Sequence, residues 1–258
     1  SAPATCLLIL RAPAGGLLSP RPAATGGGGG GACGELCVDW EGGLAPLPFA
    51  WRRGCTVALR NLVLVAGGCI HNCQTSLCYA LAPEAGAWLR APSLLHKRNV
   101  AAAACHLGGA WVVGGYDGRA HLASAEHLTP ALCEAAREAR AARGDKPEPA
   151  EPGVAPELRG WAWASAPPLL TARSSLGVAS VRGSLYAVGG YGPAPAPHGA
   201  GSPPTALRSA EVLHRGARAW APLPPLVEGR SDLAVVGYGG HVYAVSYTHL
   251  RAHETDSY

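Results

Sequence analysis

Three segments of the chain share one pattern, and this pattern decides the fold: VALRNLVLVAGG at residues 57–68, ACHLGGAWVVGG at 104–115 and ASVRGSLYAVGG at 179–190. In each segment a short apolar stretch leads through a polar or glycine turn into β-prone residues, and the segment ends in a glycine pair. This order predicts a β-hairpin whose second strand stops abruptly. Glycine there allows backbone angles, or a close approach of neighbouring chain, that a side chain would forbid.

Two further predicted strands follow each hairpin, so the repeating unit has four strands. Residues 122–128 (LASAEHL) and 207–213 (LRSAEVL) match each other, and residues 76–81 (SLCYAL) are a weaker third copy. A tryptophan strand comes next and ends in a proline-rich turn that leads to an arginine. We expect the tryptophans to pack one repeat against the next, and they are Trp88, Trp161 or Trp163, and Trp220.

This order of arginine, apolar strand, glycine pair, Ser-x-Glu strand and tryptophan strand resembles the kelch repeat, one blade of a β-propeller, over roughly residues 36–245. The first glycine follows Arg98 and Arg173 by 16 residues and Arg53 by 14. A phosphate-binding loop is disfavoured because its glycines must open a helix, whereas GGYDG at 114–118 continues as turn and strand. The resemblance implies an all-β fold: a partial kelch β-propeller with about three complete four-stranded blades and incomplete blades at both ends.

The predicted domains follow the repeats. Residues 1–51 are expected to form a degenerate partial blade with a Gly/Pro-rich loop, and residues 52–245 the kelch repeats, with blades at 52–94, 97–169, 172–226 and, truncated, 230–245. The second blade carries an insertion at 129–158, either a partner-binding arm or a tolerated loop, in which residues 131–143 favour helix.

The last residues break the register of the repeat. Ser246 and Tyr247 stand where the next glycine pair is due, 16 residues after Arg230. The segment SYTHLRAHET also resembles the translation of sequencing-adapter DNA. We therefore expect residues 246–258 to be a non-native tail.

Composition argues against several classes of partner. The chain has 21 basic and 17 acidic residues and a net charge of +4, and its arginines are not clustered with aromatic residues, so no nucleic acid is expected. No apolar run approaches the roughly 18 residues that span a bilayer, and no secretory signal is evident, so we expect no membrane and a cytoplasmic protein with reduced cysteines. The cluster CIHNCQTSLC at 69–78 fits no zinc spacing, which leaves a redox-sensing thiol as its functional alternative and predicts no metal or cofactor.

Candidate partner-binding residues come from the same resemblance. In kelch-type ubiquitin ligase adaptors, arginines at the start of successive blades line one face and bind acidic or polar peptide segments, because a guanidinium offers a planar fork to carboxylates. The arginines at that position here are Arg53, Arg98, Arg173 and Arg230. Tyr116 and Tyr191 follow glycine pairs on loops, where a rigid scaffold could present them as aromatic anchors. Solvated turn residues and ordinary turn packing are the alternatives.

The resemblance thus implies a protein-binding propeller, the substrate-recognition module of a cullin-RING E3 ubiquitin ligase adaptor. Such adaptors reach the cullin through BTB and BACK domains, and neither is visible in this sequence. Other kelch propellers are enzymes that act on sugars or scaffolds that bind actin, and these are the alternatives. We do not predict an enzyme, because no glycine-flanked nucleophile, HExxH motif or paired carboxylates occur.

Overall fold

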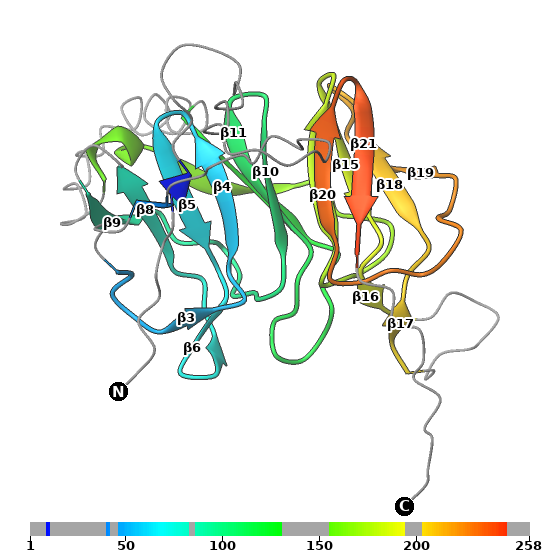
Figure 1. Ribbon diagram of the computed structural model, residues 1–258, viewed down its shortest axis with the longest axis horizontal. Helices are drawn as coiled ribbons and strands as arrows, with labels where there is room; N and C mark the ends of the chain where they lie inside the picture. The colour runs from blue at the N-terminus through cyan, green and yellow to red at the C-terminus, as the bar shows by residue number, and fades with distance from the viewer. Residues whose placement is uncertain are drawn as a thin grey trace, which may run out of the picture.

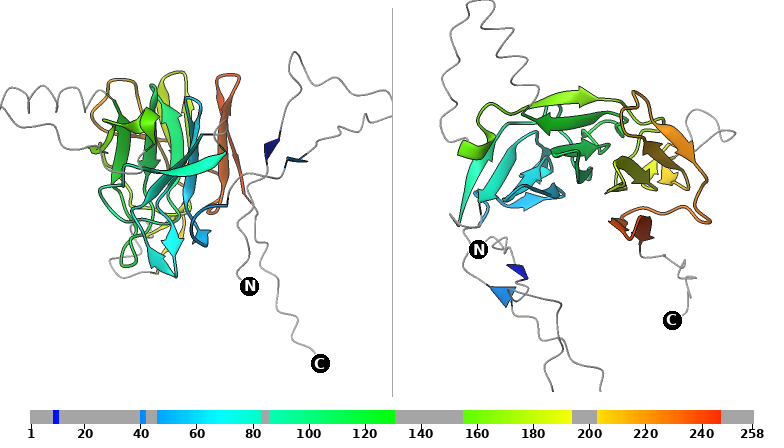
Figure 2. Two further views of the ribbon diagram at one scale, coloured as in Figure 1. Left: turned by 90° about the vertical axis from the view of Figure 1, so that its left-hand side faces the viewer. Right: turned by 90° about the horizontal axis from the view of Figure 1, so that it is seen from above.

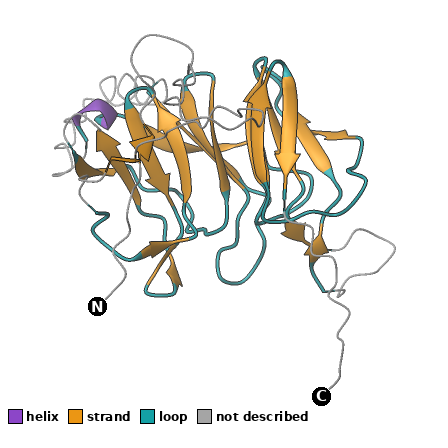
Figure 3. Cartoon of the chain, viewed as in Figure 1, coloured by secondary structure: helices purple, strands orange, loops and turns teal. Residues whose placement is uncertain are grey.

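The structure is a computed structural model of the 258-residue chain, and it describes residues 9–10, 40–41, 46–82, 86–130, 155–193 and 203–246. Almost all of its regular structure is β-strand, with one short 3₁₀ helix at Pro156–Leu158 (Figure 3). In these ranges, no helix is long and apolar enough to cross a membrane. The predicted helix at 131–143, most of residues 1–51 and residues 247–258 lie outside the described residues.

Three antiparallel sheets have four strands each, and in each the strands pair in chain order. Blade 1 consists of β4 (Cys55–Leu59), β5 (Leu62–Ala66), β8 (Cys78–Ala82) and β9 (Ala87–Ala91). Blade 2 consists of β10 (Ala102–His106), β11 (Gly109–Val113), β12 (Ala125–Thr129) and β13 (Ala162–Ala166). Blade 3 consists of β14 (Gly177–Val181), β15 (Ser184–Val188), β18 (Ala210–Leu213) and β19 (Ala221–Leu223).

A fourth blade has two described strands, β20 (Ala234–Tyr238) and β21 (His241–Val245). The first strands of successive blades, β4, β10, β14 and β20, contact one another in that order. Seen from above, the blades stand side by side along an open arc (Figure 2). These sheets confirm the predicted all-β fold, a partial propeller.

Short strand pairs lie at one end of the blades, at the bottom of Figure 1. β3 (Trp51–Arg52), β6 (Cys69–Ile70) and β7 (Cys73–Gln74) form one small sheet, and β16 (Tyr191–Gly192) pairs with β17 (Thr205–Ala206). Near the N-terminus, β1 (Ile9–Leu10) pairs with β2 (Trp40–Glu41). The small sheets mark the end at which the loops between second and third strands meet the connections between blades.

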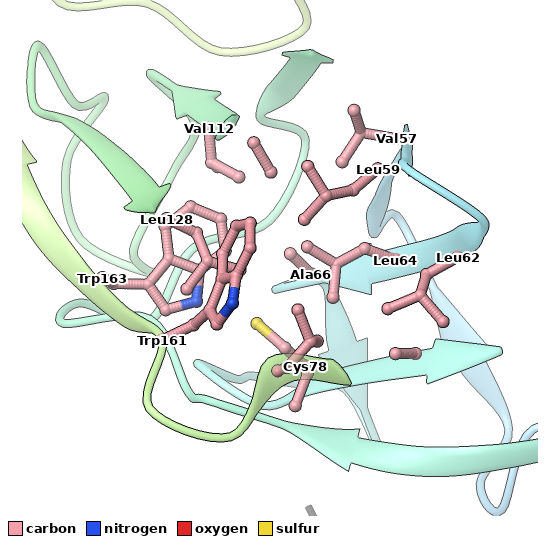
Figure 4. Packing of buried hydrophobic residues seen from close by; sticks show 14 of the residues in the cluster. Val57, Leu59, Leu62, Leu64, Ala66, Cys78, Val112, Leu128, Trp161 and Trp163 are labelled. Carbon is pink, nitrogen blue, oxygen red and sulfur yellow. The ribbon is translucent and has the colours of Figure 1, made fainter. Parts of the chain in front are cut away.

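The apolar core lies between adjacent blades. The largest cluster joins blades 1 and 2 and includes Leu64, Val112, Leu128 and Trp163 (Figure 4). A second cluster joins blades 2 and 3, while the described cluster between blades 3 and 4 is small. Burial of this kind drives the stacking of blades, because a single sheet cannot bury both of its faces.

The predicted packing role of two tryptophans is confirmed. Trp163 and Trp220 are buried, and each donates its indole N–H to a proline carbonyl of the preceding blade's outer end, Pro92 and Pro167, both at 2.8 Å. Trp88 is half-buried. Each buried tryptophan therefore fastens its own outer strand to the connection that leaves the previous blade.

The end of the insertion in blade 2 is also part of the core. Ala155 donates its N–H to the carbonyl of Arg90 at 2.8 Å, and Leu158 and Trp161 are buried. The guanidinium of Arg60 lies 4.8 Å from the centroid of the Trp161 ring, within cation–π range. This segment, next to the described 3₁₀ helix, covers blade 1.

Candidate functional site

A buried hydrogen-bond network surrounds the arginine that opens blade 2. Arg98 is 0% exposed and donates from Nη1 to the carbonyls of Gly114 (2.8 Å) and Ser124 (3.0 Å), and from Nη2 to Ser124 Oγ (3.1 Å) and Glu126 Oε1 (2.6 Å). The Glu126 carboxylate also accepts the backbone N–H groups of Leu95 (2.6 Å) and His96 (3.1 Å). The network therefore fastens the third strand of the blade to the connection that enters it.

The same network recurs in blade 3 around Arg173, which is also 0% exposed. Its Nη1 donates to the carbonyls of Gly189 (2.8 Å) and Ser209 (2.9 Å), and its Nη2 donates to Ser209 Oγ (2.9 Å) and Glu211 Oε1 (2.5 Å). Glu211 accepts the N–H groups of Leu170 and Thr171. Burial lowers the pKa of Arg173, while Glu211 acts in the opposite direction.

These contacts correct the prediction for two of the four arginines. Arg98 and Arg173 do not line an accessible face, because their guanidinium groups are enclosed and bonded within the blade. The sequence showed the matching Ser-x-Glu motif but not that the third strand passes beside the arginine. Both arginines thus hold the blades together.

Blade 1 replaces this ion pair with an aromatic pair. Trp51, not Arg53, lies 16 residues before the first glycine, and its indole N–H donates to the Gly67 carbonyl at 2.5 Å, as the arginines do in the next two blades. Tyr79 takes the glutamate's place, because its neighbour Cys78 pairs with Ala66 as Ala125 pairs with Val113. The Trp51 and Tyr79 rings meet edge to face with centroids 5.6 Å apart.

This register corrects two predictions. Arg53 is two positions past the repeat's arginine and corresponds to Val100 and Ser175, since the Val100 N–H donates to the Arg53 carbonyl and the Ser175 N–H to the Val100 carbonyl. The third-strand copy in SLCYAL is likewise displaced by one residue. The spacing of 14 rather than 16 was the signal in the sequence.

The glycine pairs act as the joints between blades. The second glycine of each pair, at 68, 115 and 190, donates its N–H to the carbonyl of the arginine that opens the next blade. Both glycines of each pair have positive φ, and a Cβ at Gly114 would lie 2.5 Å from the carbonyl oxygen of Arg173. The close approach therefore explains the repeated Gly-Gly.

A pocket of about 320 Å³ opens at this end of the propeller. The connections between blades and the loops after the glycine pairs contribute its lining, which consists of Arg53, Gln74, Asn99, Val100, Tyr116, His121 and Ser174. Backbone bonds fix its walls: Asn99 and Tyr116 exchange two hydrogen bonds of 2.9 Å, and Ser174 and Tyr191 exchange bonds of 2.9 and 2.7 Å. Two of the predicted residues, Arg53 and Tyr116, thus come together here, and Tyr191 adjoins them.

Aromatic rings border one side of the pocket. His121 lies between two tyrosines, with ring centroids 5.4 Å from Tyr116 and 5.8 Å from Tyr191, and its Nδ1 is 3.1 Å from Ser174 Oγ. Burial lowers the pKa of His121, so its imidazole is neutral at neutral pH. The side chain of Tyr191 is 41% exposed and can be reached from solvent.

The pocket also presents one cation and one buried acceptor. Arg53 is exposed, and within the described residues it forms no salt bridge. Asn99 is buried and donates its side-chain N–H to Cys69 Sγ at 2.9 Å, while its Oδ1 has no hydrogen-bond partner. An unpaired buried acceptor costs free energy that a donor from a bound molecule would recover.

The neighbouring loop is held by Asp117. Its Oδ1 accepts the backbone N–H groups of Arg119 (2.7 Å) and Ala120 (2.8 Å), and these bonds lower the pKa of its carboxyl group. Asp117 thus shapes the loop that carries Tyr116 and His121.

The remaining predicted residue, Arg230, lies outside this pocket in blade 4. Its side chain is 30% exposed, with Nη1 3.2 Å from Ser246 Oγ and Nη2 3.7 Å from Glu228 Oε2. It occupies the same repeat position as Arg98 and Arg173 but lacks their glutamate.

The cysteine cluster is divided by burial. Cys69 and Cys78 are buried, whereas Cys73 is exposed. Burial raises the pKa of the Cys78 thiol, and it raises that of Cys55 to about 12. In the ranges that the structure covers, no group of three or more His, Cys, Asp or Glu side chains could hold a metal ion.

Sequence reasoning missed Asn99, His121, Ser174 and Gln74. Asn99 and Ser174 directly follow the repeat's arginines, so their position in the repeat could have indicated them. His121 and Gln74 occupy no repeat position, and only the folded loops bring them to the pocket.

Comparison with known proteins supports the repeat assignment. Residues 172–227, which span blade 3, match the kelch motif. No curated protein sequence matches the chain significantly. Together with the four-stranded sheets, this match supports a partial kelch β-propeller.

Proposed function

We propose that this chain is a protein-binding propeller that captures a peptide segment of its partner in the pocket beside Arg53. Propellers with kelch motifs are usually protein-binding scaffolds, and residues 172–227 carry that motif. The observation that supports this site most directly is the combination of an exposed guanidinium with the unpaired Oδ1 of buried Asn99. A ligand that fits both must offer a carboxylate or carbonyl to Arg53 and an N–H or O–H donor to Asn99.

An extended acidic peptide has this chemistry. Its side-chain carboxylate would pair with Arg53, and its backbone amides or a hydroxyl group would supply the donor. Tyr116 and Tyr191 would contact its apolar groups, because tyrosine offers a large contact area at low cost in conformational entropy. Arg53, Tyr116 and Tyr191 thus keep the partner-binding role predicted from the sequence.

The test starts from a random peptide library displayed on phage and selected against the immobilised chain. Selected peptides are then titrated against the wild-type chain, Arg53→Ala and Tyr191→Ala, with Arg159→Ala, an exposed arginine outside the pocket, as the control. We expect enrichment of Asp and Glu and a loss of affinity of about tenfold or more for Arg53→Ala, since a hydrogen bond to a charged group contributes on the order of 1.5 kcal/mol or more. Equal affinity for all four proteins would contradict the proposed site.

The finer form of the proposal is that the chain recruits substrates to a cullin-RING ubiquitin ligase in the cytoplasm. It rests on the resemblance to kelch-type adaptors, whose cullin-binding domains are not in this sequence. The test is to express the complete gene product and ask whether it co-precipitates a cullin, and whether Arg53→Ala prevents ubiquitination of a captured partner. A product that binds no cullin would reject the ligase role and leave the peptide-binding role standing.

A further inference from the structure

Blade 4 presents an open sheet edge. In blades 2 and 3 the second strand pairs with a third, β11 with β12 and β15 with β18, whereas the described part of blade 4 ends its sheet at β21. Apolar side chains of this hairpin are exposed, among them Tyr238 (77%) and Val245 (69%). An edge of this kind offers unpaired N–H and C=O groups to an incoming strand.

The arginine that would hold a third strand is already in position. The carbonyl of Arg230 accepts the N–H of Gly190 at 2.7 Å, and its N–H donates to the Leu207 carbonyl at 3.1 Å, as the backbone of Arg173 does with Gly115 and Leu122. Its guanidinium has only the longer contacts to Ser246 and Glu228. Arg230 is therefore placed as Arg98 and Arg173 are, with much of its donor capacity unused.

The backbone donors of the network recur as well. Leu170 and Thr171, three and two residues before Arg173, donate their N–H groups to Glu211. Val227 and Glu228 stand three and two residues before Arg230. Neither N–H has an acceptor among the described residues, and Val227 is 90% exposed. Three separate donor groups thus await one carboxylate.

The register of the complete blades defines the strand that fits. Val113 and Val188 pair with Ala125 and Ala210, the middle residues of the two Ser-x-Glu motifs. Val245 holds the same position in β21, so an added strand would place its Ser-x-Glu centre opposite Val245 and its glutamate opposite Ala244. The residue two places after the glutamate is a buried leucine in both complete blades, at 128 and 213.

We propose that the edge of β21, together with Arg230 and the N–H groups of Val227 and Glu228, binds an extended segment of a partner protein that reads Ser-Ala-Glu-x-Leu. The segment adds to the sheet antiparallel to β21, a known mode of peptide recognition. Its glutamate pairs with Arg230, and its alanine and leucine cover the apolar side of the hairpin. This site is independent of the pocket beside Arg53, to which Arg230 does not contribute.

The probe for the test is a fluorescein-labelled peptide with the sequence of residues 205–215, TALRSAEVLHR. Its fluorescence anisotropy is measured while the full chain is titrated in, and the measurement is repeated with the same peptide carrying Glu211→Gln. The protein variants are Arg230→Gln and, as a matched control, Arg218→Gln at an exposed arginine. Hydrogen exchange of the bound chain locates the peptide.

We expect saturable binding that weakens about tenfold or more with either the Glu211→Gln peptide or Arg230→Gln, and no further loss when both changes are combined, because they remove the same ion pair. Amide exchange should slow at residues 227–228 and in β21. Equal binding of the two peptides, insensitivity to Arg230→Gln, or the absence of saturable binding would each overturn the proposal. So would a dimer of the chain that buries β21 and is not displaced by the peptide.

Discussion

The arginine, glutamate and glycine of each repeat act as one unit at the residue scale. Arg173 and Glu211 are both buried, and each also bonds to backbone groups that have no solvent to turn to. A buried ion pair is costly to break from one side, because the remaining charge stays uncompensated. The stability of the blade therefore depends on the intact pair.

Replacing Arg173 with methionine tests this dependence. We expect Arg173→Met to lower the free energy of unfolding by about 3–5 kcal/mol, since Glu211 is left as an unpaired buried charge. Glu211→Gln, which keeps an acceptor for Leu170 and Thr171, should lose less. Urea unfolding followed by tryptophan fluorescence measures both, with Arg218→Met at an exposed position as the control, expected within about 0.5 kcal/mol of wild type. A similarly small effect of Arg173→Met would show that the pair is not structural.

At the scale of elements, the glycine pair joins the end of one hairpin to the start of the next blade. Gly114 has φ +64° and stands against the Arg173 carbonyl, and Gly115 donates its N–H to that same carbonyl. The connection between blades can run so close only because neither residue has a side chain. The joint is thus a matter of space as well as backbone angle.

Two alanine substitutions separate space from angle. Gly108, in the β10–β11 turn, has φ +79°, and a Cβ added there would meet no atom within 4 Å, so Gly108→Ala should lose only the cost of a left-handed alanine, about 1–2 kcal/mol. Gly114→Ala should lose clearly more, because the carbonyl of Arg173 must also move. Thermal or urea unfolding compares the two. Equal losses would mean that the connection shifts at no cost.

Much of the element order could be predicted from the sequence, whereas half of the arginine face could not. The glycine pairs and the Ser-x-Glu strands carry local signals that recur in register. A buried arginine and an exposed one look alike in sequence, and only the path of the third strand shows that Arg98 meets Glu126. His121 reaches the pocket through the fold of one loop, for which the repeat has no signal.

On the scale of the whole molecule, contacts between blades carry the structure. His106 of blade 2 reaches Ser180 of blade 3, with Nδ1 and Oγ 2.9 Å apart, and His127 stacks on Trp111 with ring centroids at 5.1 Å. Burial lowers the pKa of both histidines, so the folded protein holds them neutral. Protonation therefore opposes the packing of blade 2 against blade 3.

This coupling predicts the pH dependence of stability. Below about pH 6.5 the unfolded chain binds protons on these histidines that the folded chain binds more weakly, so the free energy of unfolding should fall as the pH drops from 7.5 to 5.5. The double variant His106→Gln/His127→Gln should show a smaller fall, whereas His214→Gln, at an exposed position, should behave as wild type. Urea titrations at the two pH values decide this. A fall of the same size in the double variant would assign the effect to other groups.

Blade 1 suggests how such repeats diverge during evolution. Trp51 and Tyr79 take the places of an arginine and a glutamate, and the two positions lie 28 residues apart in the chain, as Arg98 and Glu126 do. A lineage that moves between the two kinds of pair by single substitutions passes through a mixed pair in which one buried charge has no partner. Proteins stand only slightly above the stability that function requires, so selection removes most such intermediates. Across homologous blades these two positions should therefore covary, and a blade that has lost one member of the pair should have changed the other.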